Sequence, residues 1–260
     1  MVDYGLTGTV AIVGGSSSGM GRATARALAG EGCRVVLYAR RGDLLSEVAA
    51  QITAETGTET LAAPADATDH ASLEMVVERA LERFGRLDIV VNNAGGPPAG
   101  DYESFSDADW QAAYELTLLS ALRITRRALP ALRESGRGRI VNLTSSAVKE
   151  TNDGLLLSNT LRPGVIGWAK TISRDEARHG ITVNSIAPGY IATERLVHLY
   201  SSETDPDAAM KRDADTIPAG RFGDPGEIAA AVAFLCSTGA AYINGTTLLV
   251  DGGLARGLLS

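Results

Sequence analysis

The chain has 260 residues, of which 45% are hydrophobic, and a formal net charge of −7. A chain of this length buries a large core, and because no stretch has the composition of a linker we expect one domain over residues 1–260. The acidic balance repels nucleic-acid phosphate and anionic lipid, which excludes both from the expected partners.

Short β-branched runs alternate along the chain with longer segments of helical periodicity. The runs expected to form strands cover residues 9–13, 34–38, 87–91, 138–143, 180–186 and 246–250. Helices are expected between them, for example from about Met20, over 43–55 and over 71–84. Continuously apolar strands are typical of a parallel sheet covered on both faces, and its crossovers are right-handed. The pattern predicts an α/β fold: a Rossmann-type, doubly wound parallel sheet of about seven strands with helices on both faces.

The least regular region of the chain is residues 194–222. It mixes acidic and basic residues with two prolines and shows no strand pattern, although well-patterned α/β segments flank it. A mobile flap over a site and a plain surface excursion fit this composition equally well.

The cysteines and the amino terminus bear on location. Cys33 and Cys236 stand in apolar surroundings without metal-ligand spacing, so we interpret them as reduced core thiols. The amino terminus is acidic where a secretory signal would be basic, and the longest apolar run, Ile228–Cys236, is too short to cross a bilayer. We therefore expect a cytoplasmic protein with no membrane attachment and no metal site.

The segment Val13–Gly21, VGGSSSGMG, follows the first predicted strand and opens the first helix. Gly15, Gly19 and Gly21 permit a tight turn and a close backbone approach. The helix N-terminus offers N–H donors and a positive dipole end to a pyrophosphate. We expect an anion here; because the spacing departs from G-x-G-x-x-G, a flexible strand-to-helix turn is the alternative.

Several stretches match one known family. GGSSSGMG resembles its TGxxxGxG loop, with Gly14 in place of the threonine, and residues 65–68, 92–95 and 188–193 resemble its aspartate, NNAG and PGxxxT segments. The chain is identified as a member of the short-chain dehydrogenase/reductase family, similar to its 3-oxoacyl-acyl-carrier-protein reductases. The resemblance implies a dinucleotide held by Gly15, Ser17, Ser18, Gly19, Met20, Gly21, Asp66, Ala67, Asn93, Ala94, Gly95, Arg162, Pro188, Gly189, Ile191 and Thr193.

The end of the second predicted strand distinguishes between the two dinucleotides. A carboxylate there would accept a hydrogen bond from the ribose 2′-OH, whereas a basic residue accommodates a 2′-phosphate. This chain has Ala39 at the carboxylate position, followed by Arg40 and Arg41. A guanidinium binds a phosphate well, so the sequence favours NADP(H) over NAD(H).

The resemblance also implies a catalytic Ser, Tyr, Lys and Asn, of which this chain keeps only the serine, Ser145. Ser158 and Arg162 stand where the family has Tyr-x-x-x-Lys, and Thr117 stands in place of the asparagine. In the family the tyrosine protonates the substrate oxygen and the lysine lowers its pKa. A serine is a far weaker and shorter acid, so Ser158 is expected to be a poor proton donor and Arg162 to bind without relaying protons.

Pro163 bears on the local structure around Ser158. A proline is tolerated in the first turn of a helix but breaks its interior. If the helix begins near Thr160, Ser158 lies outside it, and Asn159 or Thr160 is a suitable N-cap. The substitute proton donors that the sequence offers are Lys149, Glu150, Asp153 and Tyr190, and it does not choose among them.

Two functions fit this sequence. The first is an NADP(H)-dependent oxidoreductase that transfers hydride between nicotinamide and a small carbonyl or alcohol substrate, with a non-standard proton donor. The second is a nucleotide-binding protein without redox turnover, either a regulatory binder or a non-redox enzyme. By resemblance we also expect a homotetramer or homodimer, paired through the helix near 110–133 and the helix after Arg162.

Overall fold

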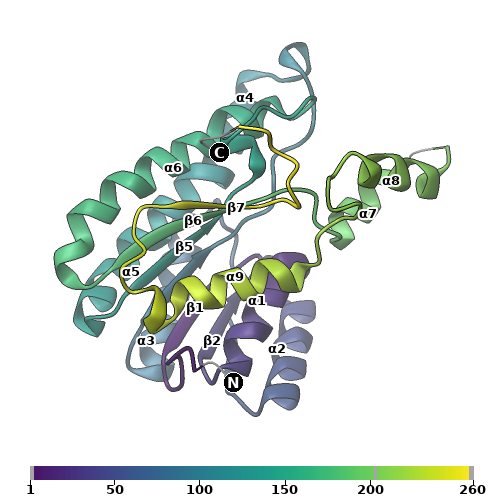
Figure 1. The fold of residues 1–260 in the computed structure, drawn as a ribbon. Helices are drawn as coiled ribbons and strands as arrows, with labels where there is room; N and C mark the ends of the chain where they lie inside the picture. Colours follow the sequence, from purple (N-terminus) through teal and green to yellow (C-terminus); the bar gives the residue numbers. More distant parts are fainter. Residues whose placement is uncertain (1–2, 202–203, 258–260) are drawn as a thin grey trace.

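The computed structural model describes residues 3–201 and 204–257, and within them seven strands form one parallel sheet. The strand order is β3-β2-β1-β4-β5-β6-β7 (Figure 1). The predicted doubly wound sheet is confirmed, and it includes one short strand, β3, for which the sequence pattern gave no separate signal. The strands are β1 (Val10–Gly14), β2 (Arg34–Tyr38), β3 (Thr60–Ala62), β4 (Ile89–Asn92), β5 (Arg139–Leu143), β6 (Thr182–Pro188) and β7 (Thr247–Val250).

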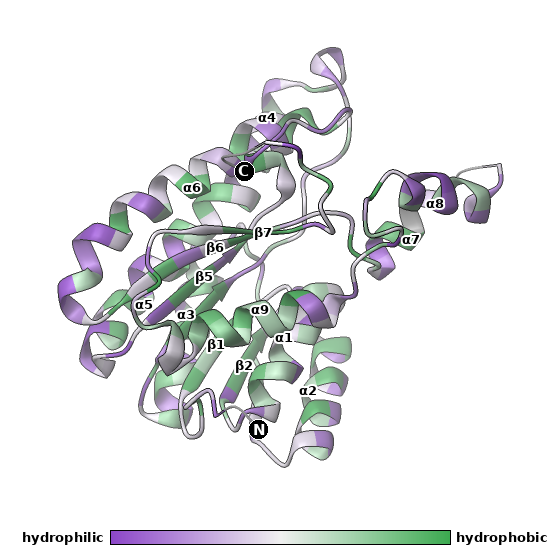
Figure 2. Ribbon diagram, in the orientation of Figure 1, coloured by the Kyte–Doolittle hydropathy of each residue, from purple (hydrophilic) through white to green (hydrophobic). Residues whose placement is uncertain are grey.

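Helices cover both faces of the sheet, and each face has its own buried core. Successive strand residues alternate between the two cores: Ala11 and Val13 belong to one, Val10 and Ile12 to the other. The first core receives α1 (Gly19–Gly30), α2 (Gly42–Thr56) and α9 (Pro225–Cys236); the second receives α3 (His70–Phe84), α5 (Ser120–Ser135) and α6 (Leu156–Glu176). Figure 2 shows hydrophobic residues concentrated in the strands and in α9.

The remaining helices lie around the carboxyl ends of the strands. They are α4 (Asp107–Tyr114), α7 (Glu194–Tyr200) and α8 (Pro206–Asp215), with the short 3-10 turns η1 (Tyr102–Ser104) and η3 (Ser146–Val148). Two further 3-10 turns, η4 (Ala177–His179) and η5 (Thr238–Ala240), precede β6 and β7 at the opposite edge of the sheet. The irregular segment 194–222 thus contains two helices, α7 and α8, which project from the body of the molecule (Figure 1); its residues 202–203 lie outside the described residues. None of the described helices is both long and apolar enough to cross a bilayer.

Two helices differ from the sequence expectation. The expected helix near 110–133 is interrupted by a π-helical turn, η2 (Glu115–Leu119), between α4 and α5. Helix α6 begins at Leu156, so the reading that starts it near Thr160 is wrong and Ser158 is helical. Pro163 lies inside α6, where it removes one N–H donor. Packing of α6 on the sheet therefore outweighs the local preference of the proline.

Asp88, directly before β4, ties β4 to β1 and to the end of α5. Its carboxylate accepts hydrogen bonds from the Val10 N–H (2.9 Å), from Ser135 Oγ (2.7 Å) and from Arg86 Nη2 (2.6 Å). Burial alone would raise the pKa of Asp88, but these hydrogen bonds outweigh it and lower the pKa below its ordinary value. The ionised side chain therefore stabilises the centre of the sheet.

Candidate active site

The turn between β1 and α1 is shaped by two close backbone approaches. A Cβ on Gly21 would lie 2.3 Å from the Gly15 carbonyl oxygen, so only glycine allows α1 to start so close to the turn. A Cβ on Gly14 would lie 2.4 Å from the Asn93 carbonyl oxygen and 2.6 Å from Tyr38 Oη. The buried Tyr38 ring therefore fills the space that a threonine at position 14 would need.

The N-terminus of α1 already binds an anionic group of the protein. Its N-cap residue, Ser18, forms no side-chain cap, and the Gly19 N–H donates instead to Glu194 Oε2 at 3.0 Å. Arg22 pairs with the other oxygen of Glu194 at 2.7 Å. Burial acts to raise the pKa of Glu194, but these hydrogen bonds and the Arg22 charge lower it overall. The turn is thus suited to an anion such as a pyrophosphate.

A cleft of about 580 Å³ runs along the carboxyl ends of the strands from this turn. It lies over the boundary between β1 and β4, where the strand order reverses direction. Most of the sequence-predicted site residues line it: Gly15, Ser17, Ser18, Gly19, Met20, Arg40, Arg41, Asp66, Ala67, Asn93, Ala94, Gly95, Ser145, Ser158, Arg162, Pro188, Gly189 and Thr193. Three do not: Gly21 is packed inside α1, Ile191 lines a smaller adjoining cavity, and Thr117 lines a third.

At the β2 end of the cleft, the exposed residues Arg40 and Arg41 stand beside Asp66. Asp66 Oδ1 accepts hydrogen bonds from the backbone N–H and the hydroxyl of Thr68, at 2.9 and 2.8 Å. The carboxylate is held by its own turn, so the two guanidinium groups are available to a ligand phosphate.

At the β5 end of the cleft, Ser145 follows the strand and Ser158 lies in the first turns of α6. Ser145 Oγ caps η3 by accepting the Ala147 N–H at 3.2 Å. The Ser145 hydroxyl keeps its hydrogen for another acceptor. Both serines line the same cleft, so a ligand oxygen placed there meets two hydroxyl groups.

Arg162 lies one turn beyond Ser158 on α6 and binds it directly. Its Nε donates to Ser158 Oγ at 2.9 Å, and its Nη1 donates to the Thr144 carbonyl oxygen at 2.9 Å. Burial, together with the nearby charge of Arg195, lowers the pKa of Arg162 to about 10. Arg162 is still cationic at neutral pH, so Ser158 Oγ accepts its hydrogen bond from a positively charged group.

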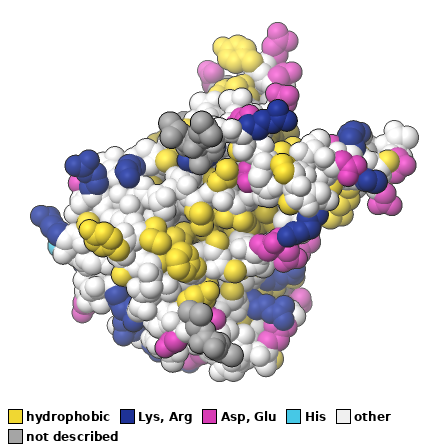
Figure 3. All heavy atoms as spheres, viewed as in Figure 1, with side chains coloured by type: hydrophobic (Ala, Val, Ile, Leu, Met, Phe, Trp, Pro, Cys, Tyr) yellow, Lys and Arg dark blue, Asp and Glu magenta, His cyan; other side chains and the backbone are white. Residues whose placement is uncertain are grey.

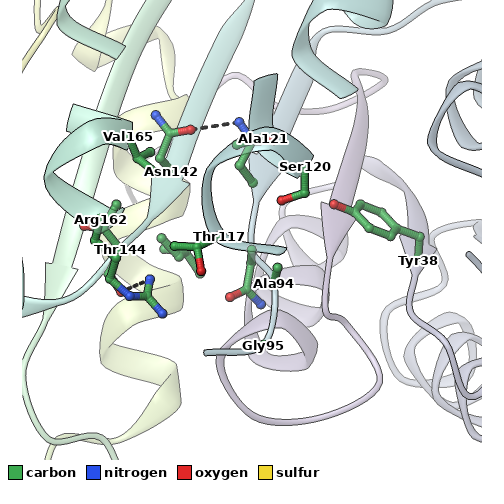
Figure 4. A pocket seen from close by; sticks show the side chains of 13 residues that line it. Tyr38, Ala94, Gly95, Thr117, Ser120, Ala121, Asn142, Thr144, Arg162 and Val165 are labelled. Atoms are coloured by element: carbon green, nitrogen blue, oxygen red, sulfur yellow. Dashed lines mark hydrogen bonds between the residues drawn. The ribbon is translucent and has the colours of Figure 1, made fainter. Parts of the chain in front are cut away.

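Thr117 and Arg162 face a third, small cavity of about 20 Å³ behind the cleft (Figure 4). Thr117 Oγ1 is buried and has no hydrogen-bond partner within the described protein, and the same holds for Asn92 Oδ1, which lines the same cavity. The cavity has room for about one water molecule between these polar atoms. The π-helical turn η2 is what carries Thr117 to this position.

Of the four substitute donors considered from the sequence, Tyr190 is the one that lines the cleft's adjoining cavity. It lines the smaller cavity, of about 210 Å³, that adjoins the cleft at Ser145. Burial, and the charges of Asp213 and Asp153, raise the pKa of Tyr190, which makes it a weaker acid. Lys149, Glu150 and Asp153 line neither the cleft nor the smaller cavity.

Three side chains at the site were missed by the sequence analysis. Tyr38 packs against Gly14, Glu194 binds the α1 N-terminus, and Arg195 donates to the carbonyl oxygens of Gly96 (2.9 Å) and Pro97 (3.1 Å) across the cleft. The partners are far apart along the chain, so no local pattern could have indicated the contacts of Glu194 and Arg195. Tyr38 follows a strand pattern that explains it as core alone.

A seven-stranded parallel sheet in this order, with a glycine turn before α1 and a cleft over the sheet's crossover point, defines a Rossmann-type dinucleotide-binding protein. The chain belongs to the short-chain dehydrogenase/reductase family: its residues 15–255 match the family model described as enoyl-(acyl carrier protein) reductase.

Relatives with known activities span nearly the whole chain. It is 36% identical over 251 residues to a 3-oxoacyl-(acyl-carrier-protein) reductase of Synechocystis sp., covering 96% of this chain and 98% of that protein. It is 37% identical over 248 residues to the corresponding reductase FabG of Escherichia coli, with 95% and 97% covered. The crystal structure of L-sorbose reductase from Gluconobacter frateurii, complexed with NADPH and L-sorbose, superposes with a TM-score of 0.95 at 32% identity, covering 99% of this chain and 100% of that one.

Proposed function

We propose that this protein is an NADP(H)-dependent oxidoreductase that interconverts a small carbonyl compound and its alcohol. The observation that supports it most is the single cleft that joins the anion-binding turn of α1, the Arg40–Arg41 pair and the two hydroxyls of Ser145 and Ser158. The relatives described above agree with this proposal, since they are reductases and one was solved with NADPH bound.

The residues present fit NADP(H). The Gly19 N–H and Arg22 already bind a carboxylate, and glycine at position 21 keeps the turn open to a close backbone approach. Arg40 and Arg41 would hold the 2′-phosphate. When bound, NADPH supplies the hydride for the reaction.

The groups that would act on the substrate oxygen are the hydroxyls of Ser145 and Ser158. Each has its oxygen engaged as an acceptor, from the Ala147 N–H and from Arg162 Nε, and each therefore has its hydrogen free to donate. We propose that they hold the carbonyl oxygen and stabilise the negative charge that develops on it.

A serine hydroxyl is a weak acid by itself, and we propose that Ser158 nevertheless serves as the non-standard proton donor because its hydrogen bond from Arg162 makes it more acidic. Hydrogen bonding from a cation favours the alkoxide form of a hydroxyl, and water screens a partly buried cation less than an exposed one. Arg162, one helical turn away, thus favours ionisation of the Ser158 hydroxyl, as the family lysine does for the family tyrosine. Ser158 Oγ–H supplies the proton to the substrate oxygen, and water in the open cleft that Ser158 lines returns a proton to Ser158 Oγ.

Hydride transfer to carbonyl compounds tests the proposal. Purified protein is mixed with NADPH and a broad panel of aldehydes and ketones, and NADPH oxidation is followed against a no-substrate control. Turnover with at least one carbonyl supports an oxidoreductase. Tight NADPH binding without oxidation by any member of the panel would favour a nucleotide-binding protein that carries out no redox reaction.

A homo-oligomer in the cytoplasm completes the proposal. Besides the α5–α6 surface expected by resemblance, Figure 3 shows hydrophobic side chains gathered on the face that carries α9 and β7, where Phe234, Tyr242 and Leu248 are exposed. The two buried free cysteines fit a reducing compartment. Light scattering after size-exclusion chromatography tests assembly, and a monomer at micromolar concentration would contradict it.

A further inference from the structure

The smaller cavity beside Ser145 has one charged residue in its wall. Its volume is about 210 Å³, and Met20, Leu155 and Leu196 contribute apolar surface to it. Ser145 reaches it from the cleft, so a carbonyl held by that hydroxyl would have the rest of its molecule here. Among the residues that the structure describes, Arg195 is the only charged residue that lines this cavity.

The charge of Arg195 is not neutralised by the protein. Its two hydrogen bonds go to the carbonyl oxygens of Gly96 and Pro97, which are neutral acceptors. No carboxylate of the described chain lies within ion-pair distance of it. A guanidinium has five N–H donors, so donors remain for a ligand.

A second unpaired guanidinium, that of Arg162, lies near enough to be affected by Arg195. Arg162 likewise donates only to neutral oxygens, those of Ser158 and Thr144. Two causes lower the pKa of Arg162: burial is the larger, and the charge of Arg195 is the smaller. Two cations held near each other without an acid favour the arrival of an anion.

The acidic residues in the neighbourhood do not fill this role. Glu194 precedes Arg195 but binds Arg22 and the Gly19 N–H. The charges of Asp153 and Asp213 raise the pKa of Tyr190, although burial raises it more. Neither carboxylate lines the cavity. An anion that pairs with Arg195 would therefore come from outside the described chain.

We propose that the carbonyl substrate carries a carboxylate and that Arg195 binds it, with the apolar body of the substrate against Leu155 and Leu196. This inference rests on the proposed function and names its substrate class, an oxo acid of medium size with an apolar chain. Arg–carboxylate pairs are frequently bidentate, so the contact would also set which face of the carbonyl meets the hydride donor. Arg195 is thus a specificity residue on α7.

A matched pair of substrates tests the proposal. The ratio of kcat/KM for 2-oxo-4-phenylbutanoate to that for its neutral ethyl ester is measured in the wild type and in Arg195→Gln. We expect the substitution to lower this ratio by about 10- to 100-fold, the effect of a hydrogen bond to a charged group. Arg212→Gln, on the same projecting segment and exposed, serves as the control and should leave the ratio unchanged. A ratio that is the same in the wild type and Arg195→Gln would overturn the proposal.

A binding measurement separates this proposal from the proposed function. Thermal shifts are recorded in saturating NADP⁺ with 4-phenylbutanoate and with the neutral 4-phenylbutanamide, neither of which is reducible. We expect the acid to stabilise the wild type more than the amide does, and this difference to vanish in Arg195→Gln. If that holds while no carbonyl is reduced, the carboxylate site stands and the oxidoreductase assignment fails. Equal stabilisation by acid and amide would overturn the carboxylate site whatever the turnover.

Discussion

Arg162 Nε donates a hydrogen bond to Ser158 Oγ over 2.9 Å, between residues one turn apart on α6. The two stand at the positions that the family resemblance assigns to a lysine and a tyrosine. As in the family pair, a cation binds the oxygen of a hydroxyl donor. The serine side chain is shorter than a tyrosine, and the guanidinium is larger than a lysine ammonium. The substrate oxygen would therefore sit closer to α6 than a phenol would allow.

Removal of the Ser158 hydroxyl is expected to lower turnover strongly. Ser158→Ala should reduce kcat by about 10²-fold, since loss of a general acid typically costs about 10² to 10⁴. Ser158→Thr, which keeps the hydroxyl, should recover part of this loss. Steady-state kinetics with the best carbonyl of the panel measure both, and Ser46→Ala on α2, whose hydroxyl donates to the Gly42 carbonyl oxygen, is the control. If Ser158→Ala retained at least half of wild-type kcat, another group would be the donor.

NADPH is expected to stabilise the protein more than NADH does. At about 100 times its dissociation constant a ligand adds roughly 2.7 kcal/mol, which raises Tm by about 5 to 10 °C in a domain of this size. Arg40→Asp should reverse the preference, because it places a carboxylate where the 2′-phosphate would sit. Differential scanning fluorimetry with both cofactors measures this. If NADPH and NADH shift the Tm of the wild type equally, and the substitution leaves both shifts unchanged, Arg40 does not bind the 2′-phosphate.

Glu194 occupies hydrogen-bond donors that a pyrophosphate would use, so the two anions are expected to compete. Glu194→Gln should tighten NADPH binding by about two- to tenfold, because the exposed ion pair that it removes contributes only a small free energy. Titration of NADPH fluorescence gives the dissociation constants. Glu78→Gln, which breaks the Glu78–Arg127 pair outside the cleft, is the matched control. Weaker binding in Glu194→Gln would mean that Glu194 closes α7 over the cofactor instead of competing with it.

Asp88 is expected to contribute stability that depends on pH. Asp88→Asn should lower the free energy of unfolding at neutral pH by about 2 to 3 kcal/mol, which corresponds to a Tm lower by roughly 4 to 12 °C. The folded-state pKa is lowered, so this stability is fully present above the unfolded value, about 3.9, and is lost as pH falls through the folded value.

Urea denaturation near pH 7 and near pH 3 compares the two proteins. The gap between wild type and Asp88→Asn should narrow in acid, whereas Asp175→Asn, an exposed residue of α6, should show no gap at either pH. A gap that persists unchanged in acid would mean that the Asp88 contribution is not electrostatic.

The sheet and the cofactor cleft could be predicted because their signals are local. Apolar runs such as 34–38 predict buried parallel strands, and the glycines of 13–21 predict a turn independently of the rest of the sequence. The start of α6 could not be read in the same way, because Pro163 argues against a helix interior and only packing on the sheet overrides it. The free-energy cost of a proline inside a helix, roughly a few kcal/mol, is smaller than the stabilisation that a long helix gains by burying its apolar face on the sheet.

The details of the candidate site depended on contacts between distant segments. Glu194 meets Gly19, and Arg195 meets Gly96, across large separations in sequence, and neither contact leaves a pattern in either segment. The hydrogen bond between Ser158 and Arg162 follows from helical spacing, but only once both are known to lie in one helix. Thr117 was found by its family position, whereas its orphaned hydroxyl is a consequence of the π-helical turn.

Deuterium transfer tests the central claim most directly. The protein is incubated with the carbonyl panel and NADPH deuterated at C4 of the nicotinamide, in separate reactions for the two faces of the ring, and the products are analysed by mass spectrometry. An oxidoreductase that holds the carbonyl against Ser145 and Ser158 should yield an alcohol that carries one deuterium from one face only, and the yield should fall in Ser158→Ala. NADPH that stabilises the protein but passes no deuterium to any product, in the wild type as in the variant, would contradict the account.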